Sequence, residues 1–251
     1  MTASHEEWAA VADRFGVDLE QVRRDHLISH VLAALGQVPT DDLVFFGGTA
    51  LSRTYLADAR LSEDIDLVAL APRTQVAAAV EASVRHALAR SHGRPSWRPA
   101  LALTRGSAPA VLGVDDTLGI QVQLVTGDGF LWPTEVRQVE QRYSDAPPAV
   151  LRTLTAAGFA AAKLATWMER RAPRDLYDMW ALAERGHVDA TAVEVFVSRG
   201  PTARPPGVWV FDTDLDEATW RRALGHQTRL RVSAMQALDA VRAAWRRAAS
   251  G

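Results

Sequence analysis

Two aspartates, Asp64 and Asp66, stand one residue apart in the segment DIDLVAL, whose alternating polar and apolar residues predict a strand. Because successive strand side chains point to opposite faces, both carboxylates lie on one face, about 6–7 Å apart. Their repulsion is costly without a cation, and Mg²⁺ or Mn²⁺ prefers such oxygen ligands. The pattern therefore predicts a metal clamp; the alternative is a pair of exposed carboxylates on an edge strand.

A glycine turn precedes this pair. Gly47, Gly48 and Thr49 follow the apolar run LVFF and begin a helical segment, so we expect a buried strand, a tight turn and a helix. Glycine lets backbone amides approach a phosphate, and a helix N-terminus favours negative charge. A triphosphate on the turn and a metal on the aspartates would together suit transfer of a phosphoryl or nucleotidyl group.

Further candidates lie in the second half of the chain. Lys163 is the single lysine among 28 basic residues, and a compact ammonium can approach a phosphate oxygen closely. Alternatively, Lys163 lies on a half-buried helix and only its amine reaches water. The segment RDLYDMW contributes Arg174, Asp175 and Asp178; alternatively it is an amphipathic turn with its apolar residues buried and an Arg–Asp pair outside.

These motifs resemble a known family. The stretch GGTALSRTYL…RLSEDIDL is similar to the signature of the nucleotidyltransferase fold. With VRRDHLISHVLAAL upstream and AAKLATW and RDLYDMW downstream, it resembles the AbiEii/AbiGii toxin family, which includes the MenT toxins of mycobacteria. The resemblance covers about residues 20–183.

The resemblance implies a role for each matching residue. The nucleotide would be bound by Gly47, Gly48, Thr49, Ser62, Lys163 and Arg174. The divalent metal would be bound by Asp64 and Asp66, and the catalytic residues would be Asp64, Asp66, Lys163 and Asp175. The chain departs from many nucleotidyltransferases at a later strand, GIQVQLV, which has Gln121 and Gln123 where a third carboxylate might stand. Glutamine is neutral and cannot act as a general base. Either this branch of the family dispenses with the third acid, with RDLYD in its place, or catalysis is weak or altered.

The implied activity is Mg²⁺-dependent transfer of NMP from an NTP to a tRNA 3′ end, by the toxin half of a toxin–antitoxin pair with a cognate antitoxin. Attachment of the nucleotide to a protein hydroxyl, or NTP binding without turnover, are the alternatives. RNA phosphates would be contacted by the basic C-terminal residues Arg221, Arg222, Arg229, Arg231, Arg242, Arg246 and Arg247. Alternatively, these arginines are the solvent-facing residues of ordinary helices.

The elements around these motifs predict an α/β (α+β) fold. We expect a nucleotidyltransferase-like mixed sheet with N-terminal helices over residues 1–145 and a mainly helical C-terminal domain over 146–251. Helical structure is predicted over 6–36, with Asp18 as an N-cap and Gly36 as a stop, and over 73–91; strands are predicted at ALALT and GIQVQLV.

Composition narrows the class further. The chain has no cysteine, no apolar run of the roughly 18–20 residues that a membrane span needs, and an acidic N-terminal segment unlike a signal peptide. A cytoplasmic protein without a membrane partner is the expectation. His26, His30 and His86 show no metal-ligand spacing with a cysteine or a third histidine, so no chemistry is assigned to them.

Overall fold

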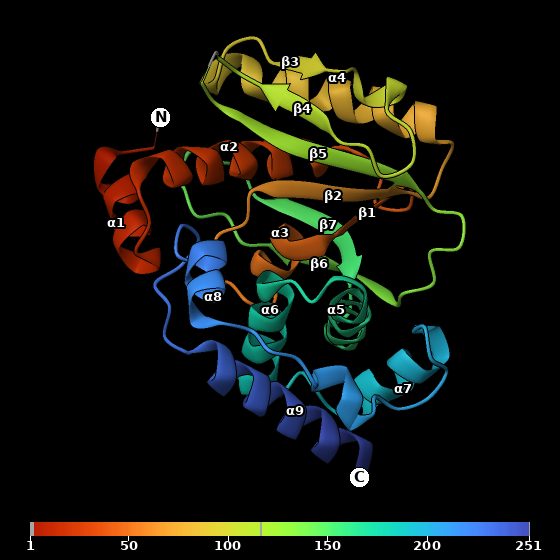
Figure 1. Cartoon of the computed structure of the whole chain (residues 1–251). Helices are drawn as coiled ribbons and strands as arrows, with labels where there is room; N and C mark the ends of the chain where they lie inside the picture. Colours follow the sequence, from red (N-terminus) through yellow and green to blue (C-terminus); the bar gives the residue numbers. More distant parts are fainter. Residues whose placement is uncertain (1–2, 116, 251) are drawn as a thin grey trace. The chain divides into compact units, whose positions relative to one another are not determined.

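The computed structural model describes residues 3–115 and 117–250 and divides into two compact units (Figure 1). The first unit comprises the chain up to Phe130 together with Glu135–Thr153. The second comprises Leu131–Thr134 and the chain from Leu154 onward.

Seven strands of the described residues form one mixed sheet, in the order β3-β4-β5-β2-β1-β7-β6. They are β1 (Leu43–Phe46), β2 (Asp64–Ala69), β3 (Ser96–Arg98), β4 (Ala110–Gly113), β5 (Gly119–Thr126), β6 (Thr134–Val139) and β7 (Ala149–Leu154). The strand β2 is antiparallel to β1 and parallel to β5. Because β2 has a partner on both sides, its aspartates do not lie on an edge strand.

The helices of the first unit are α1 (His5–Phe15), α2 (Leu19–Leu35), α3 (Gly47–Ser52) and α4 (Arg73–Ser91). The helix predicted over 73–91 is confirmed, and Asp18 caps α2 by accepting from the Gln21 amide at 2.8 Å. Within the helical stretch predicted over 6–36, Gly16 adopts a left-handed conformation (φ 67°) that ends α1, and α2 begins after the predicted N-cap Asp18. The helices α2 and α4 pack on each other and against β5 (Figure 1).

Two other strand predictions had opposite outcomes. The segment GIQVQLV forms β5, with Ile120, Val122 and Leu124 buried on one face. The segment ALALT does not form a strand: Leu101–Leu103 is a short 3₁₀ helix. Arg73 donates to the carbonyls of Leu101 and Leu124, and these long-range bonds hold the segment beside the sheet instead of in it.

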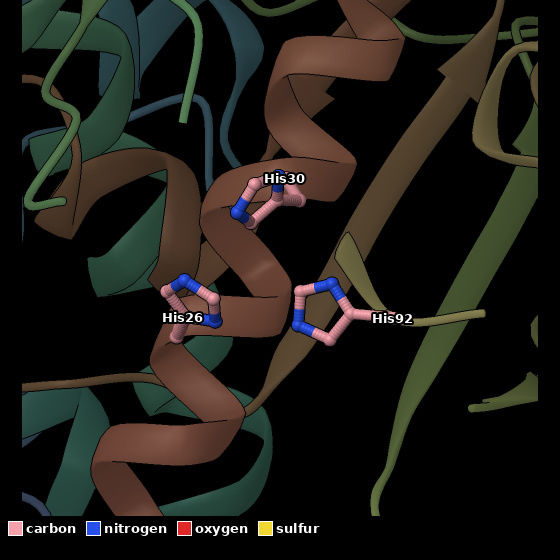
Figure 2. A group of neighbouring side chains, drawn as sticks. All are labelled: His26, His30 and His92. Carbon is pink, nitrogen blue, oxygen red and sulfur yellow. The ribbon is translucent and has the colours of Figure 1, made fainter. Parts of the chain in front are cut away.

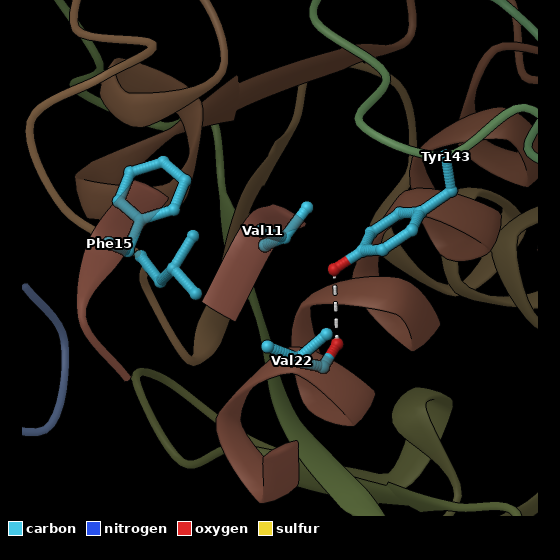
Figure 3. Close-up of a cluster of buried hydrophobic side chains, with 5 residues drawn as sticks. Val11, Phe15, Val22 and Tyr143 are labelled. Carbon is cyan, nitrogen blue, oxygen red and sulfur yellow. Dashed lines mark hydrogen bonds between the residues drawn. The ribbon is translucent and has the colours of Figure 1, made fainter. Parts of the chain in front are cut away.

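A hydrophobic cluster joins the N-terminal helices to the aspartate motif. Val11 and Phe15 of α1 pack with Val22 of α2, Leu61 and Tyr143 (Figure 3). The Tyr143 hydroxyl donates to the Val22 carbonyl at 3.2 Å. Leu61 lies three residues before Asp64, so the cluster fixes the segment that leads into β2.

The second unit is mainly helical, with α5 (Ala156–Arg170), α6 (Pro173–Glu184), α7 (Ala190–Arg199), α8 (Glu217–Leu224) and α9 (Ala234–Ser250). A second 3₁₀ turn spans Val208–Phe211. Trp167, Trp220 and Trp245 are fully buried and form much of the core. The indoles of Trp167 and Trp220 donate to backbone carbonyls at 3.0 Å, which satisfies their buried N–H groups.

Candidate functional site

The glycine turn between β1 and α3 is shaped by the side chains beside it. Gly47 has φ +78°, a conformation that favours glycine, and a Cβ there would overlap the Asp66 carboxylate. A Cβ on Gly48 would lie 2.8 Å from Arg60 Nη2 and 3.1 Å from Ser62 Oγ. Both glycines therefore make room for functional groups that come from the next segment of the chain.

The turn and the aspartate strand are also tied by a hydrogen bond. The buried Thr49 hydroxyl donates to the backbone carbonyl of Asp64. Because that hydroxyl is engaged, any phosphate contact by Thr49 falls to its backbone amide. The helix α3 has only six residues, so the turn itself offers more to a ligand than the helix dipole does.

The two aspartates lie on the same face of β2, as the alternation predicted. Asp64 and Asp66 are half-buried, whereas Ile65 and Leu67 point into the core. On the neighbouring parallel strand, Gln121 pairs with Asp64 and Gln123 with Asp66 in register. The position expected for a third carboxylate is thus occupied by glutamine, and the Gln123 amide donates to the Ser107 carbonyl.

Arg60 lies beside the glycine turn and is a candidate residue that sequence reasoning missed. Its side chain is buried and lies against Gly48, and Nη1 donates to the Leu61 carbonyl at 3.3 Å. Ser62 is also buried, and its hydroxyl faces the same glycine. The signal for Arg60 was its place inside the motif RLSEDIDL.

A buried charge network holds the far end of α3. Asp25 accepts from Arg53 and Arg142 at 2.8 Å each and from the Tyr143 hydroxyl at 3.2 Å. Burial alone would raise the pKa of Asp25, but Arg142 and Arg53 outweigh it and the pKa lies below its usual value. Burial, aided by Arg142, lowers the pKa of Arg53 to about 10, so Arg53 remains charged at neutral pH.

Arg53 directly follows α3, and this network therefore fixes the helix that carries the glycine turn. Its Nη1 also donates to the Glu140 carbonyl at 3.0 Å, while Arg142 Nη2 donates to the Ser52 carbonyl at 2.9 Å. Burial raises the pKa of Tyr143, which stays a neutral donor.

In the second unit, Lys163 meets the acidic residues of the RDLYD segment. Its amine lies 2.7 Å from Asp178 Oδ2 and 3.2 Å from Asp175 Oδ1. Asp175 also accepts two bonds from Arg170, at 2.7 and 2.9 Å. All three predicted residues are buried, so neither the solvent-reaching lysine nor the outward Arg–Asp pair describes this segment.

Arg174 stands apart from this cluster. It is half-buried in the first turn of α6, and within residues 3–115 and 117–250 it makes no hydrogen bond or ion pair. Leu176 and Met179 are buried as the amphipathic pattern predicts, but Trp180 is only half-buried.

The basic C-terminal residues lie on and around α8 and α9. Those with exposed side chains are Arg221, Arg222, Arg229, Arg231, Arg246 and Arg247. Arg242 is half-buried and donates to the Phe211 carbonyl at 2.9 Å. Arg221 pairs with Glu217 at 3.2 Å on the exposed surface of α8, a contact worth little in water.

None of the helices in the described residues is long and apolar enough to cross a bilayer. Residues 30–248 match the model of the family described as nucleotidyl transferase AbiEii toxin, type IV toxin–antitoxin system. The matched range includes the C-terminal helices, which the sequence motifs alone did not cover.

A structural relative is a crystal structure of a candidate nucleotidyltransferase from H. pylori. It is 16% identical, superposes with a TM-score of 0.53, and the match covers 93% of this chain and 96% of that one. At this identity the likeness concerns the fold. No curated protein matches the sequence significantly. The family match over most of the chain, together with the glycine turn and the paired aspartates, shows that this protein belongs to the AbiEii family of type IV toxin–antitoxin nucleotidyltransferases.

Proposed function

We propose that this protein transfers NMP from an NTP to the 3′ end of tRNA, with Mg²⁺ bound by Asp64 and Asp66, and that a cognate antitoxin neutralises it. The observation that carries the proposal is the packing of Asp66 against Gly47, because it joins the expected phosphate turn and metal ligands in one place. Membership of the AbiEii family supports the transferase activity and the toxin role.

The residues of the first unit fit a divalent cation and a triphosphate. Two half-buried carboxylates on one strand face are the oxygen ligands that Mg²⁺ prefers, and glycine leaves room for the nearer one. When bound, the ion would neutralise charge on the phosphate oxygens. The amides of Gly47, Gly48 and Thr49 would donate to the phosphates, and the Ser62 hydroxyl and Arg60 guanidinium would shape the turn.

We also propose roles for residues of the second unit, on the family's motifs AAKLATW and RDLYDMW. Lys163, whose amine lies 2.7 Å from Asp178, would contact the triphosphate. Asp175 would be the further acidic catalytic residue, and Arg174, which has no partner within the described residues, would donate to a phosphate. The exposed arginines of α8 and α9 would contact RNA phosphates.

One observation favours a second candidate, an NTP-binding protein without turnover. Gln121 and Gln123 stand in register with Asp64 and Asp66, and neither can accept the proton of the attacking hydroxyl. If Asp175 does not supply that function, nucleotide would bind and pyrophosphate would not be released.

The test is labelling of total tRNA with each α-labelled NTP in Mg²⁺, with pyrophosphate release measured in the same reactions. We expect the wild type to label RNA with at least one NTP and the Asp66→Asn variant to fall to background. Asp128→Asn, which changes an exposed carboxylate after β5, is the matched control and should retain activity.

The other outcomes separate the alternatives. If the label appears in protein instead of RNA, the acceptor is a protein hydroxyl. If calorimetry shows binding of Mg²⁺-NTP but no pyrophosphate is released, the non-catalytic candidate is supported. Equal RNA labelling by the wild type and Asp66→Asn would refute the assigned site.

A further inference from the structure

Three histidine side chains meet in the first unit, away from the aspartate strand in sequence. His26 and His30 lie one turn apart on α2, and His92 follows the last residue of α4. Their ring centroids are 4.7 to 5.0 Å apart, and the rings meet edge-on or tilted (Figure 2). One ring nitrogen from each histidine lies within 4.8 Å of the others. Sequence reasoning assigned no chemistry to His26, His30 or His86 and did not consider His92, which the fold brings to the first two.

A carboxylate completes the group. His26 Nε2 lies 3.1 Å from both oxygens of Asp145, and His30 Nε2 lies 3.4 Å from Asp145 Oδ2. The His30 side chain is only 6% exposed and its Nε2 makes no hydrogen bond within the described residues, because the contact with Asp145 is poorly directed. A buried polar nitrogen without a partner is costly, and a bound ligand would satisfy it.

We propose that His26, His30, His92 and Asp145 bind one Zn²⁺ ion. Three imidazoles and one carboxylate, with no thiolate in the chain, suit Zn²⁺ in a tetrahedral site. Two ligands of a tetrahedral zinc stand about 3.3 Å apart, which the Asp145 contacts of 3.1 and 3.4 Å already match. The histidine nitrogens must close from at most 4.8 Å, which small rotations of the rings can supply.

The residues around the four proposed ligands leave access for the ion and indicate a structural role. A cavity of about 340 Å³ borders the group and is lined by Trp8, Arg23, His26, His92 and Asp145 among others. The positive charge of Arg23 is paired with Asp115 at 3.4 Å. The Ser91 hydroxyl lies 2.9 Å from His92 Nδ1, which leaves Nε2 available to the metal. The ion would cross-link α2, the end of α4 and the segment after β6.

The experiment uses full-length protein without a histidine tag, stripped with EDTA and titrated with Zn²⁺ by calorimetry, and with Co²⁺ by visible absorption. We expect one Zn²⁺ per chain, tetrahedral cobalt bands, and a zinc-dependent rise in the midpoint of thermal unfolding. His92→Ala should weaken Zn²⁺ binding by more than about 100-fold, beyond what loss of a merely orienting residue costs. His86→Ala removes an exposed histidine of α4 and should bind as the wild type does.

The same variants also test whether a loss of binding comes from a loss of folding. His92 is half-buried at a helix end, so its metal-free variant should keep the circular dichroism of the metal-free wild type. Asp145→Asn, which preserves the side-chain shape, provides a second variant and should also weaken binding. The proposal is overturned if the wild type takes up no stoichiometric Zn²⁺, or if His92→Ala and Asp145→Asn bind Zn²⁺ as tightly as His86→Ala does.

Discussion

Replacing Asp25 by alanine should destabilise the first unit severely. The carboxylate is 1% exposed and is the shared acceptor of two buried guanidinium groups, Arg53 and Arg142. Removing one partner of a buried ion pair costs about 3–5 kcal/mol, because the remaining charge is left uncompensated. Loss of the Tyr143 hydrogen bond adds about 1 kcal/mol.

The expected loss is therefore about 4–6 kcal/mol, a large share of the roughly 5–15 kcal/mol that stabilises a typical domain. It corresponds to a fall of about 10–20 °C in the unfolding midpoint for a unit of this size. Urea and thermal unfolding followed by circular dichroism would measure it. The matched control on the same helix is Glu20→Ala, which breaks only the exposed pair with Arg24 and should cost about 0.5 kcal/mol or less.

If Asp25→Ala does not fold, Asp25→Asn keeps the volume and one acceptor oxygen and should give a smaller shift in the same direction. The reasoning is refuted if Asp25→Ala moves the unfolding midpoint no more than Glu20→Ala does. In that case the two guanidinium groups would be stabilised by backbone carbonyls alone.

Three other predictions concern Asp25, Gly47 and Lys163. Because the pKa of Asp25 is lower in the folded state, its contribution to stability is present above about pH 4 and is lost as the pH falls further. Urea unfolding midpoints measured from pH 3 to 7 should therefore fall less steeply in acid for Asp25→Asn than for the wild type. Gly47→Ala should abolish nucleotide labelling of RNA because the new Cβ would displace Asp66. The control Gly129→Ala has φ +77° and nothing within 4 Å of its Cβ, so it should incur only a backbone strain of about 1–2 kcal/mol and keep activity. Equal activities of the two variants would contradict the assignment of the turn. Lys163→Met should lower the stability of the second unit by about 3 kcal/mol, because Asp178 loses an amine at 2.7 Å while Asp175 keeps Arg170. An unchanged midpoint of thermal unfolding would show that the Lys163–Asp178 pair does not stabilise the fold.

The parts of the fold that local sequence determines were predictable. The alternation in DIDLVAL and the paired glycines predicted β2 and the turn, and Asp18 and Gly36 marked the ends of α2. The start of α2 after Asp18 was predicted, but the end of α1 at Gly16 was not, because a glycine inside a helical pattern is also compatible with continuous helix. The segment ALALT has the apolar character of a strand, but Arg73, about thirty residues away, binds its carbonyls and keeps it out of the sheet.

The candidate site was predictable only where its residues are close in sequence. Asp64, Asp66 and the glycines stand in one motif, whereas the burial of Arg60 depends on the turn that folds over it. His26 and His30 have the one-turn spacing of helical metal ligands, but His92 lies 62 residues beyond His30 and no spacing rule connects them. Gln121 and Gln123 stand in register beside Asp64 and Asp66, so the neighbouring strand carries amides at these two positions.

The anchoring of α3 has a consequence for how nucleotides would be told apart. Arg53 holds one end of the helix through a buried guanidinium, and the Thr49 hydroxyl holds the other to β2. A backbone fastened at both ends cannot adapt to different bases, and under the proposed function its amides would recognise only what all four nucleotides share. Discrimination among adenine, guanine, cytosine and uracil would then come from side chains outside this turn, and exchanging those side chains should alter base preference without harming phosphate recognition.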